Sequence, residues 1–392
     1  MATSTLAEPL AAKIYSFDLA FSEGRERLIA EVCQLHESTC AEYKRIIRMR
    51  IALLIAVVAS PVAAQELYVS DASKIVGTYK PAKSDHSPKA MAAAADAFAK
   101  SLNDGQRKKL LSKLKTPVRR QWTNLPARKD ADGVRMGDLN EVQIKAACNL
   151  MAALFSRQGY NKMRNIMLAD DQLLRNGQPR PGFGTENFSL VIFGEPSTTK
   201  PWGFQLDGHH VGVNVSIEGE KVGMSPSFIG TQPEAFKIAT TEFQPFAGEV
   251  GDAYKLMASL TDEQKAKAVI ASKRGKISFG PGADGNAAKP KGVACSTFDD
   301  KQKAVLMSLI GQWVGDLPPK QAQARMKKLE SEIDKMTFAW NGPTRPRSDI
   351  SYYITGPSLI IEYACQDLGG DPLAHLHSMY RDPTNEYGGQ MK

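Results

Sequence analysis

The sequence is poor in the residues that mark several common protein classes. It contains only 5 Cys in 392 residues, which excludes a small scaffold held together by many disulfides. Its 50 Lys and Arg exceed its 42 Asp and Glu by only +8 and form no long basic run, so we expect no nucleic-acid partner. Hydrophobic residues make up 42% of the chain, enough to bury the core of one large or two medium domains.

Familiar catalytic motifs are also missing. The chain has no G-x-S-x-G pattern, no Walker phosphate-binding loop and no H-E-x-x-H pattern. Residues 280–285 match G-x-G-x-x-G, but Pro290 interrupts the segment that should form the phosphate-binding helix. We therefore interpret residues 279–292 as a loop.

Residues 49–64 are typical of a secretory signal peptide. Arg48 and Arg50 provide a basic flank, an apolar run of about ten residues follows, and small residues precede a cut after Ala64. The run is shorter than the about 20 apolar residues that span a bilayer. A buried core helix is the alternative interpretation. We expect an exported protein, periplasmic or extracellular after cleavage near Ala64, with no membrane span in the mature chain.

The position of this segment determines the expected domain organisation. A signal peptide belongs at the N-terminus, so residues 1–48 are interpreted as a non-native N-terminal extension upstream of a true start at Met49. Whether residues 1–48 are translated stays open. The mature chain is then expected to begin with a flexible segment, 65–86, and to continue as a single domain over 87–392.

Cleavage leaves three cysteines, Cys148, Cys295 and Cys365. An odd number permits at most one disulfide and leaves one thiol free. Their spacing matches no C-x-x-C zinc or redox pattern, so we expect structural, buried cysteines.

The order of periodic segments predicts an α+β fold, with helical layers packed on an antiparallel sheet in a single large domain. Apolar residues at helical spacing predict helices over 87–114, 139–154, 159–174, 246–259, 262–273, 298–314 and 319–335. Alternating residues predict strands over 186–193, 202–206, 210–217, 222–229, 335–341, 351–354, 358–364 and 375–380. This order lacks the regular βαβ alternation of a doubly wound fold.

Three expected helix starts resemble one another. Residues 101–108, 259–265 and 297–303 each place an acidic residue shortly before a Gln and a basic residue. Because acidic residues favour the first turn of any helix, capping chemistry alone produces such echoes. We do not interpret them as an internal repeat.

Histidine is rare but clustered. Four of the six histidines lie in two tight pairs, His209 with His210 and His375 with His377. Two residues at i and i+2 on a strand project from the same face, so His375 and His377 can reach one metal ion at about 2 Å. The alternative is that these histidines are packed in the core or at an interface.

The two histidines of the first pair, His209 and His210, are expected to have different roles at the metal site. In a strand His209 and His210 point to opposite faces, so one of them joins the site unless a bulge after Gly208 re-aims the chain. His210 shares a face with polar residues, which favours it as the metal ligand. His209 is then a supporting or packed residue.

Two further residues are candidates on chemical grounds. Glu362 lies in an otherwise apolar strand, where a carboxylate is costly unless it is paired, hydrogen-bonded or metal-bound. It is therefore the best general acid/base or fourth ligand, although a salt bridge to Arg381 or Arg347 is the alternative. Trp202 is a candidate substrate contact, with core packing as the alternative.

Three segments resemble a known family. They are W-x5-G-H-H at 202–210, the strand segment 356–363, and H-x-H-x-x-Y-R-D-P at 375–383. Together they resemble the bacterial domain of unknown function family 3500, over roughly residues 91–388. The resemblance implies a secreted or lipoprotein-like bacterial protein with one large domain, and lends no established reaction. On its basis Arg381 enters as a catalytic candidate and Asp382 as a possible substrate contact.

We therefore expect an exported metal-dependent enzyme acting on a small molecule. Copper, iron or zinc would be held by His210, His375 and His377, with His209 as a further candidate and Glu362 as acid/base. Hydrolysis by metal-activated water and oxidation by a redox metal both stay open. The alternatives are a non-catalytic periplasmic protein that binds a metal or small ligand, and a structural protein with packed histidines. The oligomeric state stays open.

Overall fold

The computed structural model describes residues 67–126, 132–175, 181–368 and 370–391. The expected signal segment at 49–64 and the extension at 1–48 lie outside these residues. Helices and strands of the described chain combine in one α+β unit that begins at Leu67. This fold class is the one that the sequence predicts.

The ordered unit starts earlier than residue 87. Helix α3 (Asp71–Thr78) lies within the segment expected to be flexible, and its Ala72 and Val76 are part of the main hydrophobic core. The Ser70 side chain accepts a hydrogen bond from the Ser73 backbone N–H and caps the helix. Two buried apolar residues one turn apart therefore anchor this segment.

After α3, the first half of the unit contains four more helices and four long strands. The helices are α4 (Pro88–Ser101), α5 (Asp104–Leu110), α6 (Glu141–Leu154) and α7 (Arg157–Arg175). The strands are β3 (Ser189–Phe193), β4 (Trp202–Gly208), β5 (Val211–Glu218) and β6 (Lys221–Thr231). The single helix expected over 87–114 is divided, because Asn103 caps a new helix after Leu102 ends the preceding one.

The second half follows the same plan. Its helices are α8 (Ala247–Ser259), α9 (Asp262–Ala268), α10 (Asp300–Val314) and α11 (Pro319–Glu332). Its strands are β11 (Thr337–Asn341), β12 (Ser351–Gly356), β13 (Leu359–Cys365) and β14 (Leu376–Arg381). A small separate hairpin, β7 (Phe236–Ile238) and β8 (Thr241–Phe243), stands between the halves in the sequence.

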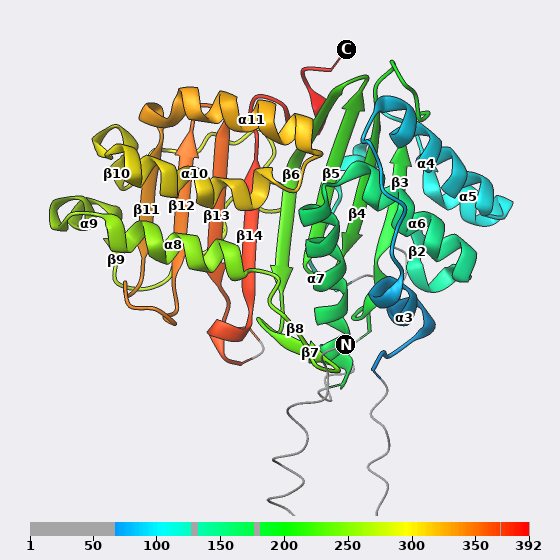
Figure 1. Ribbon diagram of the computed structural model, residues 1–392, viewed down its shortest axis with the longest axis horizontal. Helices are drawn as coiled ribbons and strands as arrows, with labels where there is room; N and C mark the ends of the chain where they lie inside the picture. The colour runs from blue at the N-terminus through cyan, green and yellow to red at the C-terminus, as the bar shows by residue number, and fades with distance from the viewer. Residues whose placement is uncertain (1–66, 127–131, 176–180, 369, 392) are drawn as a thin grey trace, which may run out of the picture. The chain divides into compact units, whose positions relative to one another are not determined.

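All the long strands belong to one sheet with the order β1-β3-β4-β5-β6-β14-β13-β12-β11-β10. Each half adds two short strands: β1 (Leu111–Ser112) and β2 (Val134–Arg135) pair with β3, and β9 (Val269–Ala271) and β10 (Val293–Ala294) pair with β11. Among the described strand pairs, β1–β3 and β9–β11 are parallel and the others are antiparallel. The halves meet at the antiparallel β6–β14 pair, and the long helices cover one face of the sheet (Figure 1).

The palindromic strand order shows that the chain is internally duplicated. Each half has a pair of capping boxes, Asn103–Gln106 with Asn140–Gln143 and Thr261–Gln264 with Asp299–Gln302. In each half the two box glutamines also donate hydrogen bonds to one another, over 2.9–3.3 Å in the first half and 2.8–3.1 Å in the second. Two of the three sequence echoes, at 101–108 and 259–265, therefore lie at equivalent positions of the two halves, and our interpretation of these two as capping chemistry alone was wrong. The third, at 297–303, is a capping box at a different position of the second half.

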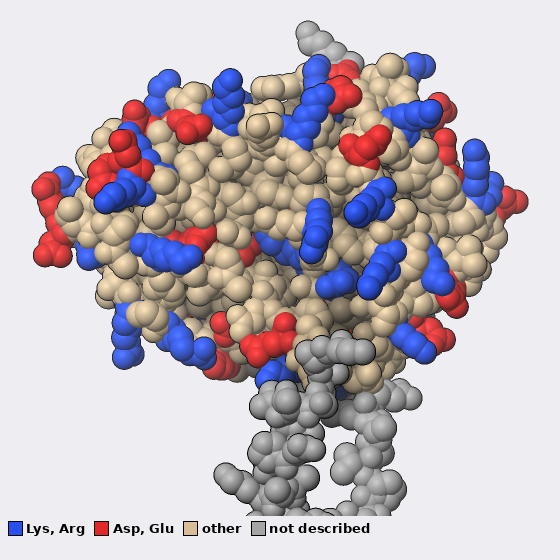
Figure 2. Space-filling model, viewed as in Figure 1, with Lys and Arg blue, Asp and Glu red and all other residues tan. Residues whose placement is uncertain are grey.

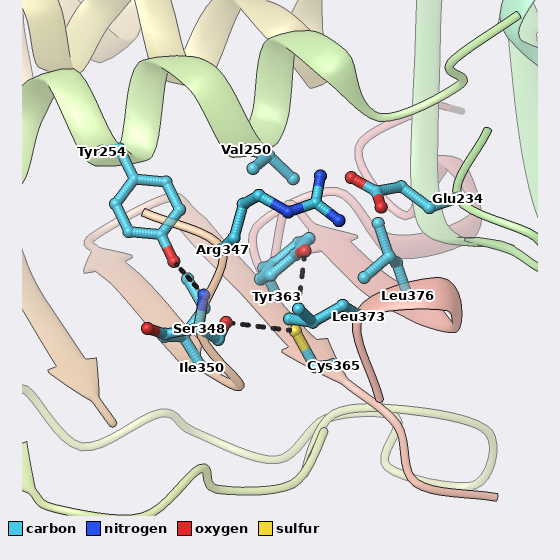
Figure 3. Close-up of a pocket in the computed structure, with 10 residues that line it drawn as sticks. All are labelled: Glu234, Val250, Tyr254, Arg347, Ser348, Ile350, Tyr363, Cys365, Leu373 and Leu376. Atoms are coloured by element: carbon cyan, nitrogen blue, oxygen red, sulfur yellow. Dashed lines mark hydrogen bonds between the residues drawn. The ribbon is translucent and has the colours of Figure 1, made fainter. Parts of the chain in front are cut away.

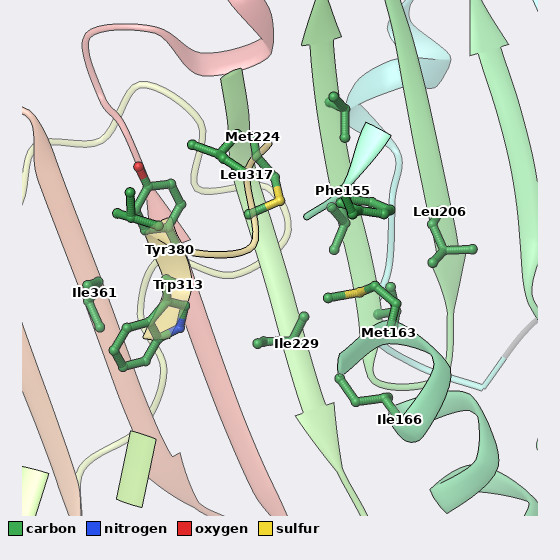
Figure 4. Packing of buried hydrophobic residues seen from close by; sticks show 14 of the residues in the cluster. Phe155, Met163, Ile166, Leu206, Met224, Ile229, Trp313, Leu317, Ile361 and Tyr380 are labelled. Carbon is green, nitrogen blue, oxygen red and sulfur yellow. The ribbon is translucent and has the colours of Figure 1, made fainter. Parts of the chain in front are cut away.

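The core lies between the helices and the sheet. Figure 4 shows Met163 of α7 near Ile229 of β6, and Trp313 of α10 near Ile361 of β13. Trp313 is 1% exposed, and its indole N–H donates to the Ser378 hydroxyl at 2.8 Å. Burying side chains of this size contributes about 1.5–3 kcal/mol each. The core thus holds the β6–β14 junction rigidly from the helix side.

The helix-covered face carries mixed charge. Lys and Arg side chains lie among Asp and Glu side chains over this face (Figure 2). Among the described residues, no helix has the length and apolar character needed to cross a membrane.

Candidate metal centre

His209 and His210 form a turn and not part of a strand. Strand β4 ends at Gly208, β5 begins at Val211, and these two residues pair across the hairpin. His210, the second residue of the turn, has a φ of 66°, in the left-handed region. The expectation that the two side chains point to opposite faces of a strand was therefore wrong.

The turn is held by backbone hydrogen bonds from two other segments. The His210 N–H donates to the Asn124 carbonyl at 3.2 Å, and its own carbonyl accepts from the Gly230 N–H at 2.7 Å. The rings of His209 and His210 stack with centroids 3.6 Å apart. Both imidazoles are buried, with 6% and 1% of their residue surface exposed.

The second pair comes from the other half of the chain. His375 follows the short helix η6 (Pro372–Ala374), and His377 is the second residue of β14. The Nδ1–H of His375 donates to the Leu368 carbonyl at 2.7 Å. Since this carbonyl can only accept, the hydrogen bond fixes the tautomer and leaves the lone pair of the neutral ring on Nε2.

Three imidazoles converge on one point. The Nε2 atom of His375 lies 2.8 Å from Nε2 of His210 and 2.9 Å from Nε2 of His377. Two ligand nitrogens that are each about 2.0–2.1 Å from one ion lie about 3 Å apart, so this spacing suits a shared metal. A second group of donor atoms within 4.8 Å of one another comprises Asp170, His209 and His210.

A glycine makes room for the convergence. Gly230 of β6 lies opposite His377 in the β6–β14 ladder. A Cβ atom at Gly230 would lie 2.8 Å from Cδ2 of His210 and 3.0 Å from Cδ2 of His377. Both rings therefore lie against bare backbone.

The surroundings keep the three rings neutral. Burial lowers the pKa of His210 and His377 well below the ordinary value, and the neighbouring histidines lower both further. Burial also lowers the pKa of His375, although the hydrogen bond to Leu368 opposes this shift. Neutral imidazole is the form that binds metal, so the site is prepared for a cation near pH 7.

Asp170 of α7 belongs to this site and was missed at the sequence level. It is 1% exposed, and its Oδ1 accepts from Nδ1 of His209 at 2.5 Å while Oδ2 accepts from the Gly184 N–H. Burial raises its pKa, and the His209 hydrogen bond opposes that shift. The available signal was the pair Asp170-Asp171 on the apolar side of a helix, where carboxylates are costly unless bonded.

The chain matches the model of one protein family, described as Protein of unknown function (DUF3500), over residues 84–389. The chain belongs to the DUF3500 family. The match covers most of both repeats and all five residues of the histidine and aspartate cluster. No curated protein and no solved structure matches the chain.

The other residues singled out from the DUF3500 segments lie outside this cluster. Glu362 of β13 accepts two backbone hydrogen bonds at 2.8 Å, from the N–H groups of Ser278 and Phe279. Burial raises its pKa, and these two bonds oppose the rise. Its carboxylate thus fastens the long loop that precedes β10, and these two bonds help to compensate a charged residue in an apolar strand.

Arg381 and Asp382 lie at the far end of β14, four and five residues from His377, or about 13 Å and more along a strand. Arg381 is 1% exposed and pairs with Asp284 at 3.0 Å and with Glu386. Asp382 pairs with Arg325 at 3.1 Å. Both residues thus lock the C-terminal segment to the sheet.

Trp202 is a core residue at the opposite end of β4 from the His209–His210 turn. It is 1% exposed, and its indole N–H donates to the Ser197 carbonyl at 3.1 Å. Cys148, Cys295 and Cys365 are buried free thiols. The structure therefore brings the four histidines together, and among the described residues the groups of metal-ligand atoms that contain them include none of Glu362, Arg381, Asp382 and Trp202.

Proposed function

We propose that the protein is a metal-dependent enzyme in which His210, His375 and His377 bind one transition-metal ion. The observation that carries this proposal is the convergence of three neutral imidazoles, two buried and one half-buried, from the two halves of the chain on a single point. Imidazole is a good ligand for copper, iron and zinc, and among the described residues no cysteine belongs to either group of ligand atoms and could favour zinc. Such an ion would activate water for hydrolysis or support oxidation of a small-molecule substrate.

The Asp170–His209 pair supports the catalytic form of this proposal. Asp170 accepts the Nδ1–H of His209, which fixes the orientation of this ring beside the ring of His210. This pair can orient a substrate or hold a proton next to the ion. It takes the role that the sequence assigned to Glu362.

One observation favours a non-catalytic metal-binding protein as the second candidate. His210 and His375 are only 1% and 5% exposed, so a substrate has little access from their sides. His377 is the half-buried member of the group, and any open coordination position lies on its side. The predicted signal peptide would place either form of the protein in the periplasm or outside the cell.

Elemental analysis tests metal binding directly. Residues 65–392 would be purified without a His tag or chelators, beside the H375A/H377A double variant and a His86→Asn control that removes a histidine outside the cluster. We expect near-stoichiometric metal in the wild type and the control, and none in the double variant. No metal in the wild type after reconstitution with copper, iron and zinc would overturn the proposal.

Anion binding then separates the two candidates. Azide added to the Cu²⁺- or Co²⁺-loaded protein shifts the ligand-field spectrum only if a coordination position is open. A saturable shift supports the enzyme. An unchanged spectrum supports the non-catalytic protein.

A further inference from the structure

A small pocket lies on the helix side of the sheet, separate from the histidines. Its volume is about 40 Å³, and helix α8 forms one wall. Figure 3 shows the lining residues, which are Glu234, Val250, Tyr254, Arg347, Ser348, Ile350, Tyr363, Cys365, Leu373 and Leu376. Because a water needs about 10–15 Å³ of such space, the enclosed part has room for about three waters, and a ligand of a few more heavy atoms would extend outward past Arg347, which is exposed.

The polar side of the pocket carries one cation and one anion. The guanidinium of Arg347 and the carboxylate of Glu234 face the same space in Figure 3. Among the described residues, neither group has a hydrogen-bond or ion-pair partner, although the positive charge of Arg347 acts on the Glu234 carboxyl. The opposite wall is apolar, with Val250, Leu373 and Leu376.

Two features show that this wall is constrained. Arg347 has a φ of 56°, a left-handed conformation that costs energy for a side chain of its size. Ser348 is only 7% exposed, and its buried hydroxyl has no hydrogen-bond partner among the described residues. A buried hydroxyl without a partner is costly, and a ligand oxygen in the pocket would satisfy it.

We propose that this pocket binds a small zwitterion of the amino-acid type. The ligand carboxylate pairs with Arg347, its ammonium group pairs with Glu234, and a methyl-sized side chain contacts the apolar wall. Arginine is suited to the carboxylate because its planar guanidinium can donate two parallel hydrogen bonds. The proposal does not depend on the metal, since none of the four clustered histidines lines the pocket.

Isothermal titration calorimetry of residues 65–392 with L-alanine tests this proposal. Propionate lacks the ammonium group and ethylamine lacks the carboxylate, so these ligands probe each charge on the wild-type protein. The variants are Glu234→Gln and Arg347→Asn, because Asn tolerates the left-handed conformation. Arg345→Asn is the matched control, an exposed arginine in the same loop that does not line the pocket.

We expect L-alanine to bind at least tenfold more tightly than propionate or ethylamine. Binding should weaken at least tenfold in E234Q and R347N and stay unchanged in R345N. Absence of L-alanine binding to the wild type overturns the proposal. Equal affinity for propionate, with no effect of E234Q, also overturns it by showing a plain carboxylate site. Metal content, measured on the same samples, reports separately on the histidine cluster.

Discussion

Gly230 and His377 are paired across the β6–β14 junction, and the imidazole of His210 occupies the space that a side chain at Gly230 would take. Two rings from different halves of the chain thus meet over one glycine. The histidine cluster depends on this residue as much as on its own side chains.

Gly230→Ala should weaken metal binding. The added methyl group would come within 2.8–3.0 Å of a carbon atom in each of two rings and of the Leu376 carbonyl oxygen, so both rings and the adjoining backbone of β14 would have to move. We expect about a 10–100-fold loss of affinity, the range seen when support of a metal site is removed. Competition with a metal indicator measures it. Gly251→Ala is the control, because a Cβ there meets nothing within 4 Å, and equal losses in both variants would contradict the steric argument.

Asp170→Asn should change the state of His209. The charged acceptor of the Nδ1–H is lost, so the ring is no longer fixed in one tautomer. The ¹⁵N shifts of the His209 ring nitrogens, recorded by NMR, report this change. In Asp171→Asn they should stay as in the wild type, since Asp171 bonds Thr185 instead. Unchanged shifts in D170N would show that the carboxylate does not control the ring.

The metal-free protein should lose stability as the pH falls below about 6.5. The pKa values of His210, His375 and His377 are lowered in the folded state, so the unfolded chain binds protons near its pKa of about 6.5 that the folded chain does not. Stability is therefore complete above this pH and decreases below it. Urea unfolding at pH 7.5 and 5.5 measures the effect.

Two aspartates change the stability in the opposite direction as the pH falls, so this prediction requires a comparison variant. Burial raises the pKa of Asp171 to about 6 and that of Asp207 to about 7, so the folded state gains protons there and is stabilised as the pH falls. The H375A/H377A variant keeps both aspartates and lacks two of the histidines. Its stability should fall less than that of the wild type between pH 7.5 and 5.5, and an equal fall would contradict the assignment.

Lys162→Met should destabilise the protein by about 3–5 kcal/mol. Lys162 of α7 lies 2.8 Å from Glu249 of α8 and 3.0 Å from Asp316, which follows α10. Its loss leaves two buried carboxylates without a cation. Urea denaturation measures the change, and adding E249Q and D316N should recover part of it. A K162M protein as stable as the wild type would show that the triad does not join the halves.

The sequence predicted the elements better than their connections. Apolar spacing placed most helices and strands, and clustering of a rare residue identified the four histidines. The alternation in 210–217 could not show that the strand starts at Val211, since a two-residue turn has the same polarity as a strand end. Asp170 was missed because it lies on a helix far from both histidine pairs in sequence. The sequence could not show that Glu362 anchors a loop, because its partners are backbone N–H groups without a sequence signature.

The duplication also has a consequence for the evolution of the cluster. The two ends of the β6–β14 pair are equivalent in the palindromic sheet, yet one end carries four imidazoles and the other carries the Arg381 ion pairs. One copy supplies His209 and His210, and the other supplies His375 and His377. Neither copy has a complete set of ligands, so the two halves can diverge in surface and loops but can no longer separate into independent chains without losing the cluster.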